Sequence, residues 1–459
     1  MAAVHELIEA ALAASRADDC IVVATEHSEA NLRWAANSLT TNGLMRTRSV
    51  TVVSVVGDGQ VGVVSRSVTT PDELAALVRD SETAARSAAA AEDAMPLVDG
   101  GADPSWEQDP AETSIEVFDR FARELGSAFR DARSREELLF GFAEHSMSST
   151  FVASSTGLRR RVDQPAGRLE LNAKSPDFRR SAYHGVQSRD FTDVDVLAVA
   201  DLLRTRLQWA STSIDLPAGR YETILPPSAV ADLIIDAYWA MAARDAEEGR
   251  SVYSAPDGTR IGQRLSDKPL TLFSDPSHPG LETADFEIAT SSDGAMQSVF
   301  DNGDPLGRTD WIRDGVLTDL VRTRSWAQQT GAPARHFTGN LILEGSDGRG
   351  GASLDDMVAA TERGLLLTCL WYIREVDPQT LSLTGLTRDG VYLVEDGAVQ
   401  GAVNNFRFNE SPVDLLGRVS EVGRTQFTLP REMSDYFTRV SMPPLRVPDF
   451  FMSTVSPAS

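Results

Sequence analysis

The stretch YETILPPSAVADLIID, from Tyr221 to Asp236, joins a run typical of a buried strand to an amphipathic helix through two prolines. Strand-to-helix junctions of this form often carry reactive groups in enzymes. We expect a helix over residues 228–247, with Pro227 at its start and Ser228 as its cap. None of its first residues, including Asp232 one turn later, binds zinc well or is placed to attack a carbonyl. The junction therefore has the form of an active site without the chemistry.

The segments on either side predict two domains. Before the junction, Val-rich runs flank a GDGQ hairpin turn at 57–60, and Thr70, Pro71 and Glu73 form a capping box for a helix to about Ala94. After it, short strands with turn residues dominate, with one helix capped at Ser353 and ending near Gly364. We predict an α+β protein. Its expected parts are an N-terminal hairpin-plus-helix domain, 1–215, and a mostly antiparallel β domain with a few helices, 216–459.

Composition excludes several classes of function. The net charge of −24, from 43 basic and 67 acidic residues, disfavours direct nucleic-acid binding, and the basic runs are short and scattered. No apolar run reaches the roughly 18 residues of a membrane span, and the first residues do not read as a signal peptide. Cys20 and Cys369 each lie in an apolar run, which indicates buried thiols in a reducing cytoplasm.

Catalytic motifs are missing from the sequence. No HExxH, HExxxH or HxH pattern links the six histidines, and no GxSxG is present. The glycine-rich 345–351 lacks the lysine of a phosphate-binding loop, and 300–307 departs from a calcium loop at two positions. Carboxylates are plentiful, but nothing singles out one pair. Motifs alone indicate an α+β protein without a visible catalytic apparatus.

A series of ordered stretches nevertheless resembles the TldD/PmbA family, and within it the TldE (PmbA) branch. They span roughly 222–423, with looser matches at 27–43 and 152–161. The stretches are ETILPPSAVADLI, SVFDNGDPLGRTDWIRDGVL, GNLILEGSDGRGGASLDDMVAATERGLLLT, LWYIREVDPQTLSLTGLTRDGVYLVEDGAVQGAV and FRFNESPVDLLGRVSEVG.

The resemblance implies where the chemistry is lost. In the family, the TldD partner carries HExxxH on this helix and a cysteine ligand near the C-terminus, and its zinc and glutamate hydrolyse peptides. In this chain the first histidine falls on Pro227, the glutamate on Ser228 and the second histidine on Asp232. Residues 422–444 contain no cysteine, and Cys369 does not stand in for it. The resemblance implies no catalytic residue, metal or cofactor here, and zinc in the partner.

The implied function is that of the non-catalytic subunit of a TldD/TldE-type heteromeric metallopeptidase acting on unfolded or modified peptides. Peptidase activity is then expected only with a TldD-like partner carrying HExxxH, in a hetero-oligomer, although a homodimer stays open. The alternative is a stand-alone peptide-binding or scaffold protein. Asp301 and Asn340 are candidate substrate-cleft residues because both lie in family-like stretches, and turn formation is the other reading of them.

Overall fold

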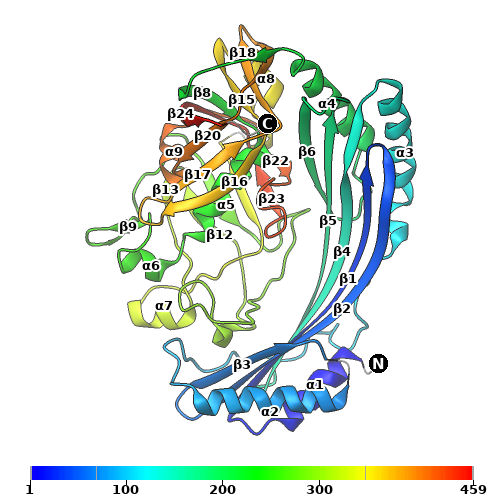
Figure 1. The fold of residues 1–459 in the computed structure, drawn as a ribbon. Helices are drawn as coiled ribbons and strands as arrows, with labels where there is room; N and C mark the ends of the chain where they lie inside the picture. The colour runs from blue at the N-terminus through cyan, green and yellow to red at the C-terminus, as the bar shows by residue number, and fades with distance from the viewer. Residues whose placement is uncertain (1–2, 69, 347, 457–459) are drawn as a thin grey trace.

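The structure, a computed structural model, describes residues 3–68, 70–346 and 348–456. Its first half is built on one six-stranded antiparallel sheet, in the order β3-β2-β1-β4-β5-β6. Four strands are long, and Figure 1 shows them as a curved wall. The strands are β1 (Asp19–Ala35), β2 (Ser38–Val56), β3 (Gln60–Arg66), β4 (Leu138–Ser154), β5 (Arg159–Lys174) and β6 (Ser181–Ser188).

Helices cover one face of this sheet. They are α1 (Val4–Ala14), α2 (Pro71–Ser87), the 3-10 helix η1 (Ile115–Phe118), α3 (Asp119–Ser134) and α4 (Val196–Trp209). Successive strand residues point to opposite faces of a sheet. Val22 and Leu32 of β1 both lie on the face that the helices cover: Val22 packs with the cluster of α1 and α2, and Leu32 packs with that of α3 and α4. Ile21, on the other face, packs in one cluster with Phe286 and Phe300 of the second half. The sheet is therefore buried on both faces near this end of β1.

The structure confirms the predicted start of helix α2 and shows that its predicted end was wrong. The Thr70 hydroxyl accepts a 3.3 Å hydrogen bond from the Glu73 nitrogen, and the Glu73 carboxylate accepts one from the Thr70 nitrogen at 3.0 Å. The helix ends at Ser87 rather than Ala94. Beyond it the chain pairs with the 57–60 turn, where the nitrogen of Ala91 donates to the Gly59 carbonyl at 2.9 Å. Tertiary pairing thus ends a helix that Ala-rich sequence would continue.

Among its described residues, the second half holds two larger sheets and one two-stranded pair, mostly antiparallel. One sheet has the order β13-β12-β11-β14-β23-β22; the other follows β16-β17-β20-β24-β8-β15-β18-β19-β7, with β21 beside β24. The strands are β7 (Ser213–Ile214), β8 (Gly219–Leu225), β9 (Ser254–Ala255), β10 (Gly258–Thr259), β11 (Thr271–Ser274), β12 (Thr309–Arg313), β13 (Val316–Leu317), β14 (Leu341–Glu344), β15 (Arg363–Leu367), β16 (Leu370–Asp377), β17 (Ser382–Thr387), β18 (Val391–Glu395), β19 (Ala398–Val403), β20 (Phe406–Glu410), β21 (Glu421–Val422), β22 (Gln426–Thr428), β23 (Val440–Met442) and β24 (Leu445–Val455).

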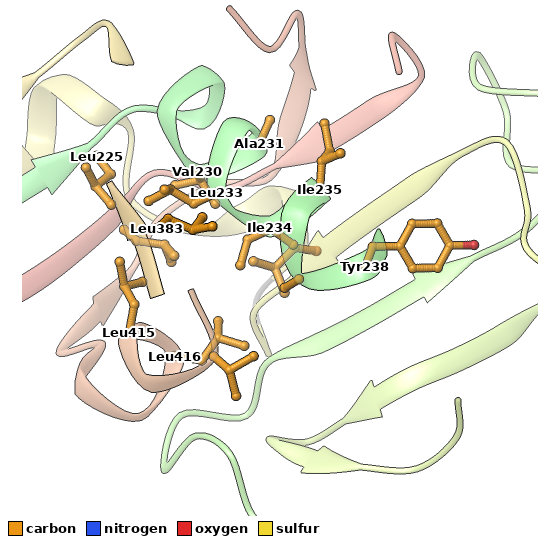
Figure 2. Packing of buried hydrophobic residues seen from close by; sticks show 14 of the residues in the cluster. Leu225, Val230, Ala231, Leu233, Ile234, Ile235, Tyr238, Leu383, Leu415 and Leu416 are labelled. Carbon is orange, nitrogen blue, oxygen red and sulfur yellow. The ribbon is translucent and has the colours of Figure 1, made fainter. Parts of the chain in front are cut away.

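Helix α5 (Pro227–Trp239) lies in the main core, which takes residues from both of these sheets. Figure 2 shows its apolar side chains with Leu383 of β17 and with Leu415 and Leu416 of α9. The other helices are α6 (Ala243–Glu247), α7 (Arg324–Thr330), α8 (Leu354–Ala359) and α9 (Pro412–Arg418), with 3-10 turns η2 (Val299–Asp301) and η3 (Gly348–Gly350). An all-round buried helix suits this position between sheets.

Three sequence predictions about these helices need correction. The single helix expected over 228–247 is two, α5 and α6, because the chain leaves the helix after Trp239 and residue 242 pairs with Val321. Ser228 is not the cap: Pro226 occupies that position. The helix capped at Ser353 ends at Ala359, and Gly364 lies in β15, where an added Cβ would sit 2.9 Å from the Glu222 carbonyl oxygen.

The α+β class with mostly antiparallel sheets is confirmed. The predicted boundary at 215/216 stays a prediction. At that point Ser213 and Ile214 already pair with β19 of the larger C-terminal sheet.

Candidate functional site

The site to be tested is the junction between β8 and α5. Strand β8 lies between β24 and β15 in the larger sheet, and it leads directly into the helix. Pro227 is the first helical residue, as predicted, and it is buried. A proline suits this position because its ring presets the helical φ and the missing N–H has no intrahelical partner to lose.

Asp232 lies one turn further along α5 and is fully buried. Its Oδ1 accepts hydrogen bonds from the backbone nitrogens of Glu432 at 2.8 Å and Met433 at 3.3 Å. Its Oδ2 is also buried and has no hydrogen-bond partner among the described residues. Burial raises the pKa of this carboxyl to about 8, against the opposing effect of the backbone donors. Asp232 is therefore a buried clamp on residues 432–433, and its carboxyl gives up its proton less readily than an exposed one.

The segment held by Asp232 also reaches the first half of the chain. The Arg431 guanidinium lies 3.9 Å from the ring centre of Trp371 and 4.7 Å from that of Tyr183 on β6. One of its nitrogens is 3.8 Å from the Glu170 carboxylate on β5, to which the Ser434 hydroxyl donates at 3.1 Å. Cation–π stacking and these polar contacts fix the segment against the N-terminal sheet.

Two adjoining pockets open beside this segment. One, of about 450 Å³, is lined by Asp236, Trp239 and Trp371, among others. The second, of about 340 Å³, includes residues of β4 and β5. Both pockets are lined by residues 434–436, including Tyr436, which is 77% exposed. Together they form a recess between the two halves, beside the C-terminal end of α5.

Asp236 is the titratable group of α5 that faces this recess. Burial, and then the charges of Glu375 and Glu432, raise its pKa to about 7. Neither Asp236 nor the 431–436 segment was predicted from the sequence. A signal existed for Asp236, which follows Asp232 by four residues and so shares its helix face. Nothing local pointed to 431–436.

The residues present do not fit a zinc site. Pro227 has no side-chain atom that can bind a metal ion. The Oδ1 atom of Asp232 already accepts hydrogen bonds from two backbone nitrogens. Across the described parts of the chain, no three His, Cys, Asp or Glu side chains form a group that could hold a metal ion. The Cys369 thiol is buried, and burial raises its pKa, which disfavours the thiolate that metals require.

Asp301 and Asn340 do not come together with the junction or its recess. Asp301 ends η2, is buried, and accepts a 3.1 Å hydrogen bond from the Arg324 nitrogen; burial raises its pKa. Asn340 is buried before β14, accepts from the Asp275 nitrogen at 3.0 Å and donates to the carbonyls of Asp275 and Leu281 at 2.6 and 2.8 Å. Both brace loops. A substrate contact by either stays a prediction.

The sequence of the C-terminal half identifies the family. Residues 218–454 match the PmbA/TldA metallopeptidase C-terminal domain. The chain belongs to the PmbA/TldD family. No curated protein matches its sequence. Within the described residues of this PmbA/TldD-family chain, no helix has both the length and the apolar character needed to cross a lipid bilayer.

Solved structures extend the likeness over the whole PmbA/TldD-family chain. TldE from Thermococcus kodakarensis is 17% identical and superposes with a TM-score of 0.78, covering 98% of this chain and 99% of its own. A candidate modulator of a DNA gyrase from Thermotoga maritima is 16% identical, with a TM-score of 0.73 and coverages of 94% and 95%. One from Bacteroides thetaiotaomicron is 16% identical, with a TM-score of 0.72 and 98% of both chains covered. At these identities the likeness establishes the fold alone.

Proposed function

We propose that this PmbA/TldD-family chain is the TldE-type, non-catalytic subunit of a heteromeric metallopeptidase that acts on unfolded or modified peptides. Zinc and the HExxxH motif would belong to a TldD-like partner. The observation that carries the proposal is Asp232: at the position expected for the second histidine, its Oδ1 clamps residues 432 and 433. This use of Oδ1 in the fold supports a non-catalytic role for the chain.

The recess beside the clamp supports a role with peptides. Its walls combine aromatic side chains with charged and polar ones, which suits a peptide chain of varied sequence. Trp239 and Tyr436 expose 36% and 77% of their surfaces, so both are open to a ligand. The two cysteines are free and buried, which supports a cytoplasmic location for the complex.

The test compares the chain alone with the chain co-expressed with a HExxxH partner from the same cell. We expect the purified lone chain to hold no stoichiometric zinc and to cleave no unfolded peptide. Co-expression should yield a complex with zinc and peptidase activity. A matched control is a partner whose motif glutamate is changed to glutamine, which should still co-purify but not cleave. Stoichiometric zinc and cleavage in the lone chain would refute the proposal.

The exposed aromatic recess also favours a second candidate, a stand-alone peptide-binding protein. Two measurements distinguish it from the first. If an unfolded peptide binds the lone chain tightly and no HExxxH chain co-purifies from the native cell, the second candidate is favoured. Replacing Tyr436 and Trp239 with alanine should then abolish peptide binding, because both side chains lie in the recess.

A further inference from the structure

A third pocket, of about 690 Å³, gathers four arginines in the C-terminal half. Arg220 lies on β8, Arg260 and Arg264 lie between β10 and β11, and Arg418 ends α9. In the view of Figure 1, β8 and α9 lie on the side away from the long strands β1 and β2. Such a gathering of positive charge stands out in a chain whose net charge is −24.

Of the four arginines, Arg418 is paired with an acidic residue of the pocket. Glu410 and Asp414 line it too, but Glu410 pairs with Arg418 and also accepts a 2.7 Å hydrogen bond from the Phe451 nitrogen. For Arg220, Arg260 and Arg264, no carboxylate oxygen of the described residues lies within 4.0 Å of a guanidinium nitrogen. Three positive charges therefore border the pocket without a paired counter-charge.

Backbone carbonyls hold the guanidinium groups in place. Nη1 of Arg220 donates to the Asp449 carbonyl at 2.9 Å, and Nη1 of Arg418 donates to the same oxygen at 3.1 Å. Nη1 of Arg260 donates to the Val252 carbonyl at 3.1 Å, and Nη1 of Arg264 to that of Asp314 at 3.0 Å. Among the described residues, Nη2 of Arg220, Arg260 and Arg264 has no such bond, so part of each fork stays free. Guanidinium groups that are anchored through one nitrogen and free at another are pre-organised to bind an anion.

A bulge in β24 supplies the shared carbonyl. The pairing of β24 with β8 shifts register between Val447 and Phe450, and Asp449 has a φ of 58°. A bulge removes backbone groups from the ladder and re-aims them. Left-handed backbone is uncommon for a residue other than glycine, and such conformations concentrate at functional sites. The bulge thus positions Arg220 and Arg418 together.

We propose that this pocket binds a compact polyanion, a small molecule bearing several phosphate or carboxylate groups. Guanidinium forks pair with both kinds of group in two-point contacts. The concave volume matches a small-molecule site, and the acidic surface elsewhere disfavours nucleic acid. This inference does not depend on the proposed peptidase function.

The test is calorimetric titration of the full-length chain at low salt with inorganic pyrophosphate and, separately, with citrate. We expect one saturable site for at least one of them, weakened by added salt; pyrophosphate would indicate phosphate groups, and citrate would indicate carboxylates. The double variant Arg260→Gln, Arg264→Gln should weaken binding about tenfold or more. The matched control Arg123→Gln, Arg130→Gln removes two exposed charges of α3 and should leave binding within about twofold.

The conservative variant Arg264→Lys separates fork geometry from charge and carries little risk of misfolding. It should bind more weakly than the parent, because an ammonium cannot reproduce the two-point contact. Absence of saturable binding of either anion would overturn the inference, as would equal weakening in the control pair.

Discussion

The Oδ1 atom of Asp232 lies 2.8 Å from the backbone nitrogen of Glu432, a residue 200 positions later in the chain. This contact joins α5 to the 431–436 segment, which lies against the N-terminal sheet. The carboxyl of Asp232 is thus part of the packing between segments far apart in the chain.

Asp232→Ala is expected to destabilise the fold. It would leave the backbone N–H groups of Glu432, which is partly buried, and Met433, which is buried, without their acceptor. We expect the free energy of unfolding to fall by about 1–3 kcal/mol, measured by urea denaturation. Asp232→Asn keeps an acceptor oxygen and should lose less. Equal stability of the alanine variant and the parent would show that the clamp is not structural.

Asp236 should make stability depend on pH in a defined direction. Its pKa rises from 3.8 to about 7 on folding, so the folded state holds the proton more tightly than the unfolded chain. The unfolded chain then binds fewer protons, and stability falls as the pH rises from about 4 to about 7. Asp236→Asn removes this dependence.

The measurement is urea denaturation of parent and variant across that pH window. The stability of Asp236→Asn relative to the parent should increase with pH, by at most about 1.4 kcal/mol per pH unit. Comparing the two cancels other groups, such as His184, whose pKa burial lowers to about 3. A pH-independent difference between the two proteins would contradict the raised pKa.

Both cysteines should resist alkylation in the folded protein. Burial raises the pKa of the Cys20 thiol to about 11 and raises that of Cys369 as well, so little thiolate exists near neutral pH. Mass spectrometry after iodoacetamide treatment should find no adduct in buffer and two in denaturant. Rapid labelling of Cys369 in buffer would mean that its region opens or that its thiol is activated.

Ile234→Ala should be among the costly core substitutions. The side chain is buried on α5 in the main core, and its removal leaves a cavity between sheets (Figure 2). We expect a loss of about 2–5 kcal/mol in the free energy of unfolding. Leu197→Ala on α4, where the side chain is 39% exposed, is the matched control and should cost under about 1 kcal/mol. Similar losses in both variants would argue against the packing of α5 described above.

Local features of the fold can be predicted from the sequence alone. The capping box at Thr70 and the proline at the first position of α5 depend on atoms within a few residues of one another, so the side chains alone predict them. The same holds for the DG turn between β2 and β3. The α+β class follows from the order and length of such segments.

Other features depended on the tertiary structure. The ends of α2 and α5 are set by backbone pairing with residues distant in the chain. Helix propensity depends on nearby residues only and does not include these partners. The clamp of Asp232 on Glu432 and the four-arginine pocket both join segments far apart in the chain. Scattered arginines in the sequence carry no sign of convergence, because strand register and helix packing, which only the folded chain defines, decide which side chains meet.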